Sequence, residues 1–486
     1  MTQASTQTFG ILAAGAYLPR TRLQRAAIHA ANRWFAPGLR GAAKGERAIA
    51  NWDEDAITLA VEAAQDCMKA DATPAQLLVL ASTSHPFADR QNAGVVADAL
   101  GIAGELRAQD MGGSMRAGTS ALMNALERGV NAGASLVVAA EHRRTKVASP
   151  QEMAYGDGAA AILVGQGKPI ATVKAMHSES VDFVHSYRMS DHSQDYGWEE
   201  RWVREEGYLK IVPRVVGALL DKAGVSPDAV THFCLPCTLP KVASSVAKKL
   251  KMADAAVRDN LTSVCGDTGA AHALLMLAHA LQQAQPGDLI VVASFGQGCD
   301  ALLLEVTAEV SKLQATRGVQ GALDHKVPSD NYMRFLAFNG LVDMERGMRA
   351  ETDKGTPLTS AYRNHDMLQG LVGGRCRHCG TVQYPRARYC VEPTCKALDS
   401  QEPHSFALSK AKVVSYTADL LTYSPDPPAW YGMVQFAEGG RMLIDFSEVD
   451  QVEVGDPMRM AFRIKDQDST RGYQRYFWKA VPDRQA

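Results

Sequence analysis

The sequence predicts an α/β protein: a duplicated, layered α/β body followed by a cysteine-rich ribbon and a small β-barrel. Short apolar runs alternate with helical patterns through the first two thirds of the chain. One stretch of that region is repeated, and four closely spaced cysteines precede a series of short alternating strands. With 486 residues, the chain is long enough for two or three domains, each with its own core.

The body is expected to contain buried strands and amphipathic helices. Short apolar runs without alternation are typical of strands buried on both faces. They occur at Leu77–Leu80, Leu136–Ala140, Ala160–Val164, Leu289–Ala293 and Ala301–Val306. A helix is predicted to begin at Asp53, Glu54 and Asp55, because negative charge stabilises a helix N-terminus.

The body also repeats itself. Ser114–Glu141 contains a Gly-associated turn, an Ala/Leu/Met helix and a buried strand, and Asp267–Phe295 has the same order. A further strand follows each copy, at Gly156–Val164 and Gly298–Val306. A period of roughly 150 residues is too long for a solenoid. We therefore expect two similar halves related by a pseudo-twofold axis, with a pocket between them.

Cys376, Cys379, Cys390 and Cys395 form the pattern C-x2-C-x10-C-x4-C. Two such pairs on short turns can present four thiolates to one zinc ion. Disulfides are not expected, because the first residues lack a basic segment followed by an apolar run. The pattern predicts a structural zinc site.

The composition excludes some classes of partner. The expected location is the cytoplasm. The formal net charge of −2 gives no case for nucleic acid or an anionic membrane as a partner. No apolar run approaches the roughly 20 residues that a spanning helix needs. The other cysteines stand in apolar or Gly-rich contexts, which is typical of small core residues. They are Cys67, Cys234, Cys237, Cys265 and Cys299.

Five short alternating strands follow the cysteines and suit a small barrel of the OB type. They are expected at Lys412–Thr417, Trp430–Phe436, Arg441–Phe446, Arg459–Arg463 and Tyr473–Trp478. OB barrels that bind single strands combine a basic groove with stacking aromatics. Here the charges of the barrel are mixed, so nucleic-acid binding is not expected.

Several motifs in this order resemble the thiolase superfamily, and most closely its hydroxymethylglutaryl-CoA synthase and ketoacyl synthase III branch. The resemblance covers about Ile11 to Val306. The motifs are Gly15–Arg20, Asp53–Ala56, Ser82–Pro86, Arg116–Thr119, Val246–Leu250, Gly266–Thr268 and Ser294–Gly298. The resemblance implies a thiolase-like layered body and an acyl-CoA ligand.

The catalytic positions that the resemblance implies hold other residues. In this branch a cysteine at a helix N-terminus accepts the acyl group, and a histidine and an asparagine assist it. Those positions fall on Met115, Pro236 and Asp267, and the synthase glutamate falls on Thr83. A thioether cannot form a thioester, so the body is expected to do no Claisen chemistry by itself.

A rearranged site is the alternative. Ser114 would need a base to act as a nucleophile, and His272 lies about one helical turn beyond Asp267. The simpler interpretation is that Ser114 caps the helix and His272 packs within it. Cys234 and Cys237 resemble a metal-ligand pair, but an apolar strand end explains them better.

The C-terminal region resembles the DUF35 family, a rubredoxin-like zinc ribbon followed by an OB fold, over about Leu371 to Pro482. Members of that family occur beside thiolase-like subunits and contribute to assembly and acyl-CoA handling. The second cysteine pair, with four intervening residues, is wider than usual for the family.

The predicted parts are two thiolase-like halves, a connector, the ribbon and the barrel. Their bounds are 1–165, 166–310, 311–370 (helical), 371–402 and 403–486. The leading hypothesis is an accessory subunit that binds acyl-CoA in a hetero-oligomer with an active thiolase or acyltransferase. The alternatives are an acyltransferase using Ser114, Asp267 and His272, and a CoA- or lipid-binding module without chemistry.

Overall fold

The computed structural model describes residues 8–484, which fall into two compact units. Unit 1 comprises the chain up to Asn51, then Asp55–Ala93 and Gly104–Leu341. Unit 2 comprises Trp52–Glu54, Gly94–Ala103 and the chain from Val342 onward. Two short segments of the N-terminal half therefore belong structurally to the C-terminal unit.

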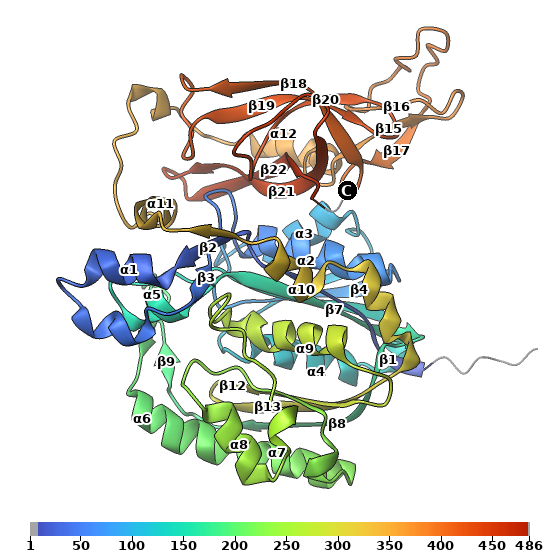
Figure 1. The fold of residues 1–486 in the computed structure, drawn as a ribbon. Coiled ribbons are helices and arrows are strands. Elements are labelled where there is room, and N and C mark those ends of the chain that lie inside the picture. The colour runs from blue at the N-terminus through green and yellow to red at the C-terminus, as the bar shows by residue number, and fades with distance from the viewer. Residues whose placement is uncertain (1–7, 485–486) are drawn as a thin grey trace, which may run out of the picture. The chain divides into compact units, whose positions relative to one another are not determined.

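Unit 1 is built on a nine-stranded sheet with the order β11-β12-β13-β8-β1-β7-β6-β4-β5 (Figure 1). The strands are β1 (Thr8–Tyr17), β4 (Ala75–Ala81), β5 (Arg107–Met111), β6 (Ala134–Glu141), β7 (Gly158–Gly167), β8 (Ala171–Ser180), β11 (His232–Cys234), β12 (Leu289–Phe295) and β13 (Gly298–Val306). The register joins β1 to β8 through the pair Ile11↔Ala171.

The sheet confirms the internal duplication. In the first half, β1·β7 and β7·β6 are antiparallel and β6·β4 is parallel. In the second half, β8·β13 and β13·β12 are antiparallel and β12·β11 is parallel. The five predicted strands are the central parts of β4, β6, β7, β12 and β13.

The principal helices of unit 1 pack in layers between and outside the two halves of the sheet (Figure 1). They are α2 (Ala56–Ala70), α4 (Ala117–Glu127), α7 (Leu209–Ala223), α8 (Val242–Leu250) and α9 (His272–Gln283), whereas most of α3 (Asn92–Leu100) belongs to unit 2. The repeated helices α4 and α9 contact each other, α2 covers β1, β7 and β6, and α7 covers β8 and β13. Buried Ala and Leu side chains of α4 and α9 contribute to one core.

The start of α2 corrects part of the sequence prediction. The N-cap is Asp55, whose carboxylate accepts the Thr58 amide at 3.0 Å, while the Thr58 hydroxyl accepts the Asp55 amide at 2.8 Å. This reciprocal pair is a capping box. Asp53 and Glu54 do not serve the helix, because both belong to unit 2.

Smaller elements complete unit 1. They are β2 (Thr21–Gln24), α1 (Arg25–Asn32), η1 (Pro37–Ala42), β3 (Glu46–Ala48), α5 (Pro150–Ala154), β9 (Ser186–Tyr187), β10 (Tyr196–Gly197), α6 (Glu200–Trp202), η3 (Val203–Tyr208) and η6 (Gly269–Ala271). The element η3 is a π-helical segment between α6 and α7.

The predicted connector 311–370 is divided between the units. Its first part contains α10 (Gly318–Asp324), β14 (Val327–Ser329) and α11 (Tyr332–Phe338), and β14 pairs with β2 of unit 1. Its last part contains α12 (Leu358–Arg363) and α13 (His365–Leu368) and belongs to unit 2. The range 311–370 therefore spans both units, and apolar residues of α11 such as Phe335 are buried in unit 1.

Unit 2 contains a small ribbon sheet and a five-stranded barrel. The ribbon order is β16-β15-β17, with β15 (Val372–Cys376), β16 (Val382–Gln383) and β17 (Gln401–Ser405). The barrel order is β20-β19-β18-β21-β22, with β18 (Lys410–Asp419), β19 (Ala429–Phe436), β20 (Arg441–Asp445), β21 (Pro457–Asp468) and β22 (Tyr473–Pro482). A bridge between Phe446 and Ala480 links the ends of the order. All five predicted barrel strands are confirmed, and the barrel is nearly closed.

Over residues 8–484, every helix is too short or too polar to cross a bilayer.

Candidate functional site

The four positions expected to carry catalysis lie at strand ends and helix starts of unit 1. Met115 stands two residues before α4, and Asp267 stands two residues before η6, which leads into α9. Thr83 and Pro236 each follow a strand by two residues, β4 and β11 respectively. The duplicated fold thus places Met115 and Asp267 at corresponding positions of its two halves.

Arg143, just beyond β6, brings Met115 and Asp267 together. Its Nη2 donates to the Asp267 carbonyl oxygen at 2.7 Å and to Oδ2 of the same residue at 3.0 Å. Its Nη1 lies 3.6 Å from the Met115 sulfur. The guanidinium carbon lies 3.6 Å from the centre of the Tyr155 ring, and the side chain is 2% exposed. A buried cation therefore lies between Met115 and Asp267.

Arg143 and Asp267 each stabilise the charged form of the other. Burial alone lowers the pKa of the Arg143 guanidinium, but Asp267, Tyr155 and Glu141 outweigh it and raise the pKa overall. Burial alone raises the pKa of the Asp267 carboxyl, but Arg143 and then His272 hold it below its usual value. Both partners are therefore charged at neutral pH.

A second buried carboxylate lies beside Thr83. Glu141, the last residue of β6, accepts the Thr83 amide at 2.7 Å, the Thr83 hydroxyl at 3.2 Å and the Ser84 hydroxyl at 2.7 Å. The residue is fully buried, and burial raises the pKa of its carboxyl despite these donors. The hydrogen bonds hold a carboxylate next to Thr83, the position predicted to correspond to the synthase glutamate.

The environment of Pro236 is apolar and aromatic. Its neighbour Cys237 is buried and hydrogen-bonded to the Tyr208 hydroxyl, and burial raises the pKa of the thiol to about 12. Tyr208 is the last residue of the π-helical segment η3, and it packs 4.4 Å from Phe295 between ring centres. Cys237 is therefore a protonated core residue and not a thiolate.

The structure does not bring Ser114 and His272 into a hydrogen bond. The Ser114 hydroxyl donates to the Gly296 carbonyl at 2.9 Å. His272 is fully buried; its Nδ1 accepts the Thr268 amide at 2.9 Å and its Nε2 lies 2.6 Å from the Asn260 carbonyl. Ser114 is also not the N-cap of α4, since Arg116 takes that position, but its Oγ accepts the Arg116 amide at 3.3 Å.

Sequence reasoning missed Arg143 and Glu141 as members of this site. Both lie in Glu141-His142-Arg143-Arg144, a charged run that directly follows the buried strand β6. Charged residues at the end of a buried strand are a signal for a site, because the fold brings strand ends and helix starts together. What the run contacts depended on the tertiary structure.

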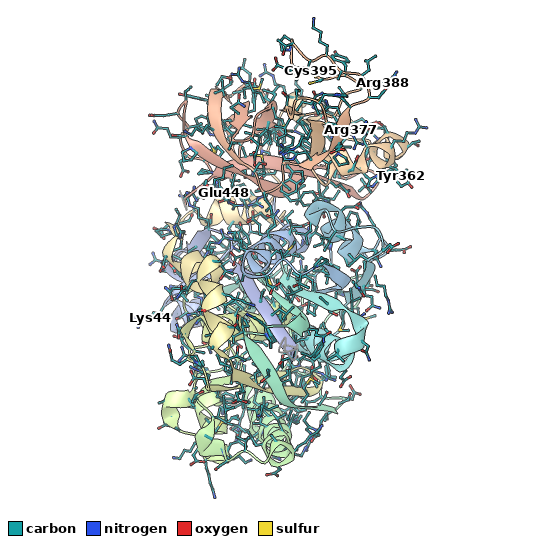
Figure 2. The ribbon with its side chains drawn as sticks, turned by 90° about the vertical axis from the view of Figure 1, so that its right-hand side faces the viewer. Lys44, Tyr362, Arg377, Arg388, Cys395 and Glu448 are labelled. Carbon is teal, nitrogen blue, oxygen red and sulfur yellow. The ribbon has the colours of Figure 1, made fainter. Side chains whose placement is uncertain are left out.

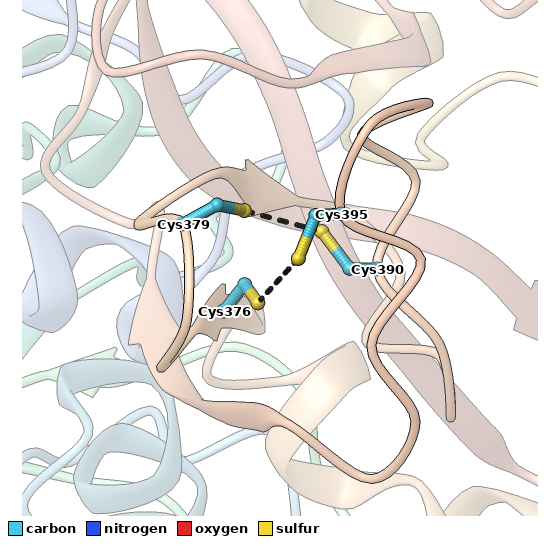
Figure 3. A group of neighbouring side chains, drawn as sticks. All are labelled: Cys376, Cys379, Cys390 and Cys395. Carbon is cyan, nitrogen blue, oxygen red and sulfur yellow. Dashed lines mark hydrogen bonds between the residues drawn. The ribbon is translucent and has the colours of Figure 1, made fainter.

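The second candidate site is the cysteine cluster of unit 2 (Figure 3). The four sulfur atoms of Cys376, Cys379, Cys390 and Cys395 all lie within 4.8 Å of one another. The sulfurs of Cys376 and Cys395 are 3.9 Å apart, and those of Cys379 and Cys390 are 3.5 Å apart. A tetrahedral zinc ion with Zn–S bonds of about 2.3 Å separates its sulfurs by about 3.8 Å. The residues therefore fit zinc.

A local hydrogen bond favours the thiolate form of Cys376, whereas burial raises the pKa of the Cys390 thiol to about 12. All four cysteines are free thiols, with no disulfide between them. The Ser400 hydroxyl lies 3.3 Å from the Cys376 sulfur and holds the pKa of that thiol down to about 6. A thiolate is the form that binds zinc. Bound zinc would hold the two turns of the ribbon together and supply no reaction chemistry with all four positions filled by protein.

Comparisons of sequence agree with this division of the chain. The 3-oxoacyl-[acyl-carrier-protein] synthase III C-terminal profile matches residues 220–305. The rubredoxin-like zinc ribbon profile of ChsH2 matches 367–399, and the C-terminal OB-fold profile of ChsH2 matches 407–463. The body is therefore a thiolase-like α/β protein fused to a zinc ribbon and an OB-like barrel.

Relatives extend the likeness across the body. A hydroxymethylglutaryl-CoA synthase from Aeropyrum pernix is 30% identical over 322 residues, covering 62% of this chain and 86% of the relative. One from Caldivirga maquilingensis is 28% identical over 350 residues, 70% of this chain and 99% of the relative. A solved hydroxymethylglutaryl-CoA synthase complexed with CoA shares the fold, with a TM-score of 0.57 and 18% identity over 70% of this chain and 92% of the other. The chain belongs to the hydroxymethylglutaryl-CoA synthase family.

Proposed function

We propose that this chain is a non-catalytic or weakly catalytic accessory subunit of an acyl-CoA thiolase or acyltransferase complex. It binds acyl-CoA and aids assembly, while a partner subunit makes or breaks the carbon–carbon bond. The proposal combines the family with the residues that occupy its catalytic positions in this chain.

The observation that carries the proposal is Arg143. Its guanidinium is buried between Met115 and Asp267, bonded to one and in contact with the other. A nucleophilic site needs an ionisable nucleophile and room for the acyl group beside it. Met115 cannot ionise, so no nucleophile is present at that position. We infer that the buried Arg143–Asp267 ion pair takes up the room that an acyl group would need.

A surface loop supports CoA binding. Trp34 and Phe35 follow α1 and are 82% and 69% exposed, with ring centres 5.6 Å apart. Arg33, Arg40 and Lys44 are exposed in the same loop, and Lys44 is labelled in Figure 2. No acidic residue precedes Glu46 in the sequence. Exposed rings beside cations suit the adenine and phosphates of CoA.

Calorimetric titration with CoA tests this loop. Loss of one aromatic stacking surface costs about 1–3 kcal/mol, so Trp34→Ala is expected to weaken CoA binding roughly 5- to 150-fold. Trp198→Ala is the matched control, because Trp198 is also exposed, at 53%, but lies outside the loop. Equal CoA affinity of wild type and Trp34→Ala would remove the loop from the proposal.

Radiolabelled acyl-CoA separates the proposed function from a catalytic one. The purified chain is expected to retain no label after denaturation and to catalyse no condensation or thiolysis. A covalent label that disappears in Ser114→Ala would instead establish the acyltransferase using Ser114, Asp267 and His272. Robust turnover by the chain alone would end the accessory hypothesis.

The partner is tested by purifying tagged chain from its native host and assaying thiolysis of acyl-CoA in the complex. We expect a thiolase or acyltransferase subunit to co-purify and to lose activity when this chain is removed. CoA affinity without any such subunit would instead indicate a CoA- or lipid-binding module.

A further inference from the structure

Unit 2 contains a tripeptide that comes from the N-terminal half of the chain. Trp52, Asp53 and Glu54 belong to unit 2, whereas the residues on either side, Asn51 and Asp55, belong to unit 1. The barrel binds the backbone of this tripeptide directly, because the Ile464 amide of β21 donates to the Asp53 carbonyl at 2.8 Å.

The side chain of Asp53 is enclosed by barrel residues. Its Oδ2 accepts Lys479 Nζ at 2.8 Å and the Ser447 hydroxyl at 2.8 Å. The ammonium of Lys479 lies 3.9 Å from the centre of the Trp52 ring. Asp53 is fully buried and Lys479 is 2% exposed. The carboxylate of Asp53 and the ring of Trp52 therefore contact a buried cation, and the Ser447 hydroxyl holds that carboxylate in place.

The next residue makes a second buried ion pair. Arg463 Nη2 lies 3.3 Å from Glu54 Oε1 and donates to Glu448 Oε1 at 2.7 Å. The Arg463 side chain is fully buried. Glu448 is labelled in Figure 2. The cluster holds two cations, Lys479 and Arg463, against three carboxylates, of which the tripeptide supplies two.

Without the tripeptide, Lys479 and Arg463 would lose the carboxylates of Asp53 and Glu54. Burying a charge without a partner is strongly unfavourable. Removing one member of a buried ion pair leaves the other member in that state and destabilises the fold. The tripeptide contacts this surface through the backbone carbonyl of Asp53, the carboxylates of Asp53 and Glu54, and the ring of Trp52.

We propose that Ser447, Arg463, Ile464 and Lys479 form a docking site for an acidic segment, filled by Trp52–Glu54 of the same chain. This site goes beyond the proposed function, because it concerns how the barrel of unit 2 binds a segment that is distant from it in the sequence. It acts independently of the covalent linker that begins at Val342.

Cleavage of the folded full-length chain tests the site. A protease site inserted after Gly347 lies in an exposed stretch of the linker, where a built Cβ meets no neighbour. After cleavage, the two fragments are expected to co-elute in size-exclusion chromatography at micromolar concentration. Separation of the wild-type fragments would overturn the proposal.

Two variants make the test specific. Asp53→Asn keeps the shape but removes the charge, and we expect it to weaken fragment association at least 100-fold. The double variant Asp53→Lys with Glu54→Lys is expected to release the fragments on cleavage. Zinc content and circular dichroism of the uncut chain show whether each variant is folded.

The control changes the same charges elsewhere in unit 2. Glu351 and Asp353 are exposed, and Asp353 pairs with Arg471 at 2.8 Å where both side chains face water. Glu351→Lys with Asp353→Lys is expected to leave association unchanged. Fragments of Asp53→Asn that bind as tightly as wild type would show that the site does not hold the segment.

Discussion

At the scale of single residues, Arg143 organises the candidate site of the body. It contacts Met115, binds Asp267 and packs on Tyr155, so one side chain joins two of the positions predicted from the family resemblance. Gly269 makes room for it, since a Cβ at that residue would come within 2.9 Å of Arg143 Nε. Arg143 thus links the residue before the start of α4 to the turn before η6.

Breaking this pair tests its importance for folding. Arg143→Leu leaves Asp267 uncompensated and is expected to lower the free energy of unfolding by about 3–5 kcal/mol. Urea denaturation followed by circular dichroism measures the change. Arg204→Leu is the control, because Arg204 is 45% exposed in its pair with Glu205 and should change stability little. Adding Asp267→Asn to Arg143→Leu should recover part of the loss.

His272 makes the stability of unit 1 depend on pH. Burial lowers the pKa of its imidazole, and the nearby Asp267 carboxylate only partly offsets this. The folded pKa is below the unfolded value of about 6.5, so the contribution is complete above about pH 6.5 and is lost as pH falls. Wild type should therefore become easier to unfold in urea between pH 7 and pH 5. A His272→Asn variant with the same pH slope would contradict this assignment.

Individual helices show how local chemistry sets the elements that carry the site. The π-helical segment η3 ends at Tyr208, which packs against Phe295. In α7, Pro213 lacks the amide that would bond to the Leu209 carbonyl. Lys249 of α8 supplies the missing donor, with its Nζ 2.9 Å from that oxygen. A neighbouring helix thus compensates for the missing backbone hydrogen bond.

The capping box of α2 can be tested alone. Asp55→Ala removes the carboxylate that accepts the Thr58 amide and is expected to cost about 1 kcal/mol, up to about 2. Thermal unfolding monitored by circular dichroism measures it. Asp191→Ala serves as the control, because its side chain is 72% exposed in a surface loop. A loss of equal size in both variants would argue against a role of the cap.

At the scale of the whole molecule, the two units differ in what stabilises them. Unit 1 has a large apolar core on both sides of its sheet, whereas the ribbon of unit 2 is small and has few buried residues. Small modules of this kind depend on a metal for stability. The buried ion pairs of Trp52–Glu54 are a second stabilising feature of unit 2.

Metal analysis tests the ribbon. We expect one zinc ion per chain by mass spectrometry, and loss of that zinc in Cys376→Ser or Cys390→Ser. Strong chelation should unfold the ribbon at a lower temperature while the transition of unit 1 changes little. Cys299→Ser, which alters a buried cysteine of β13, should keep its zinc. Full zinc content in Cys376→Ser would rule out the predicted ligand set.

The sequence by itself determined the duplicated body, the cysteine ligand set and the five barrel strands. These features arise from local patterns: apolar runs, ligand spacing and alternation report on the element that contains them. The strands β1 and β8 were not identified individually.

Only the tertiary structure decided the partners of charged residues. Asp53, Glu54 and Asp55 form one acidic run, yet Asp55 caps α2 while the other two bind Lys479 and Arg463. Arg143 and Glu141 likewise meet Asp267 and Thr83, which lie 124 and 58 residues away in the chain. Charge pairing depends on which distant strands and loops meet in space, and no local pattern encodes that.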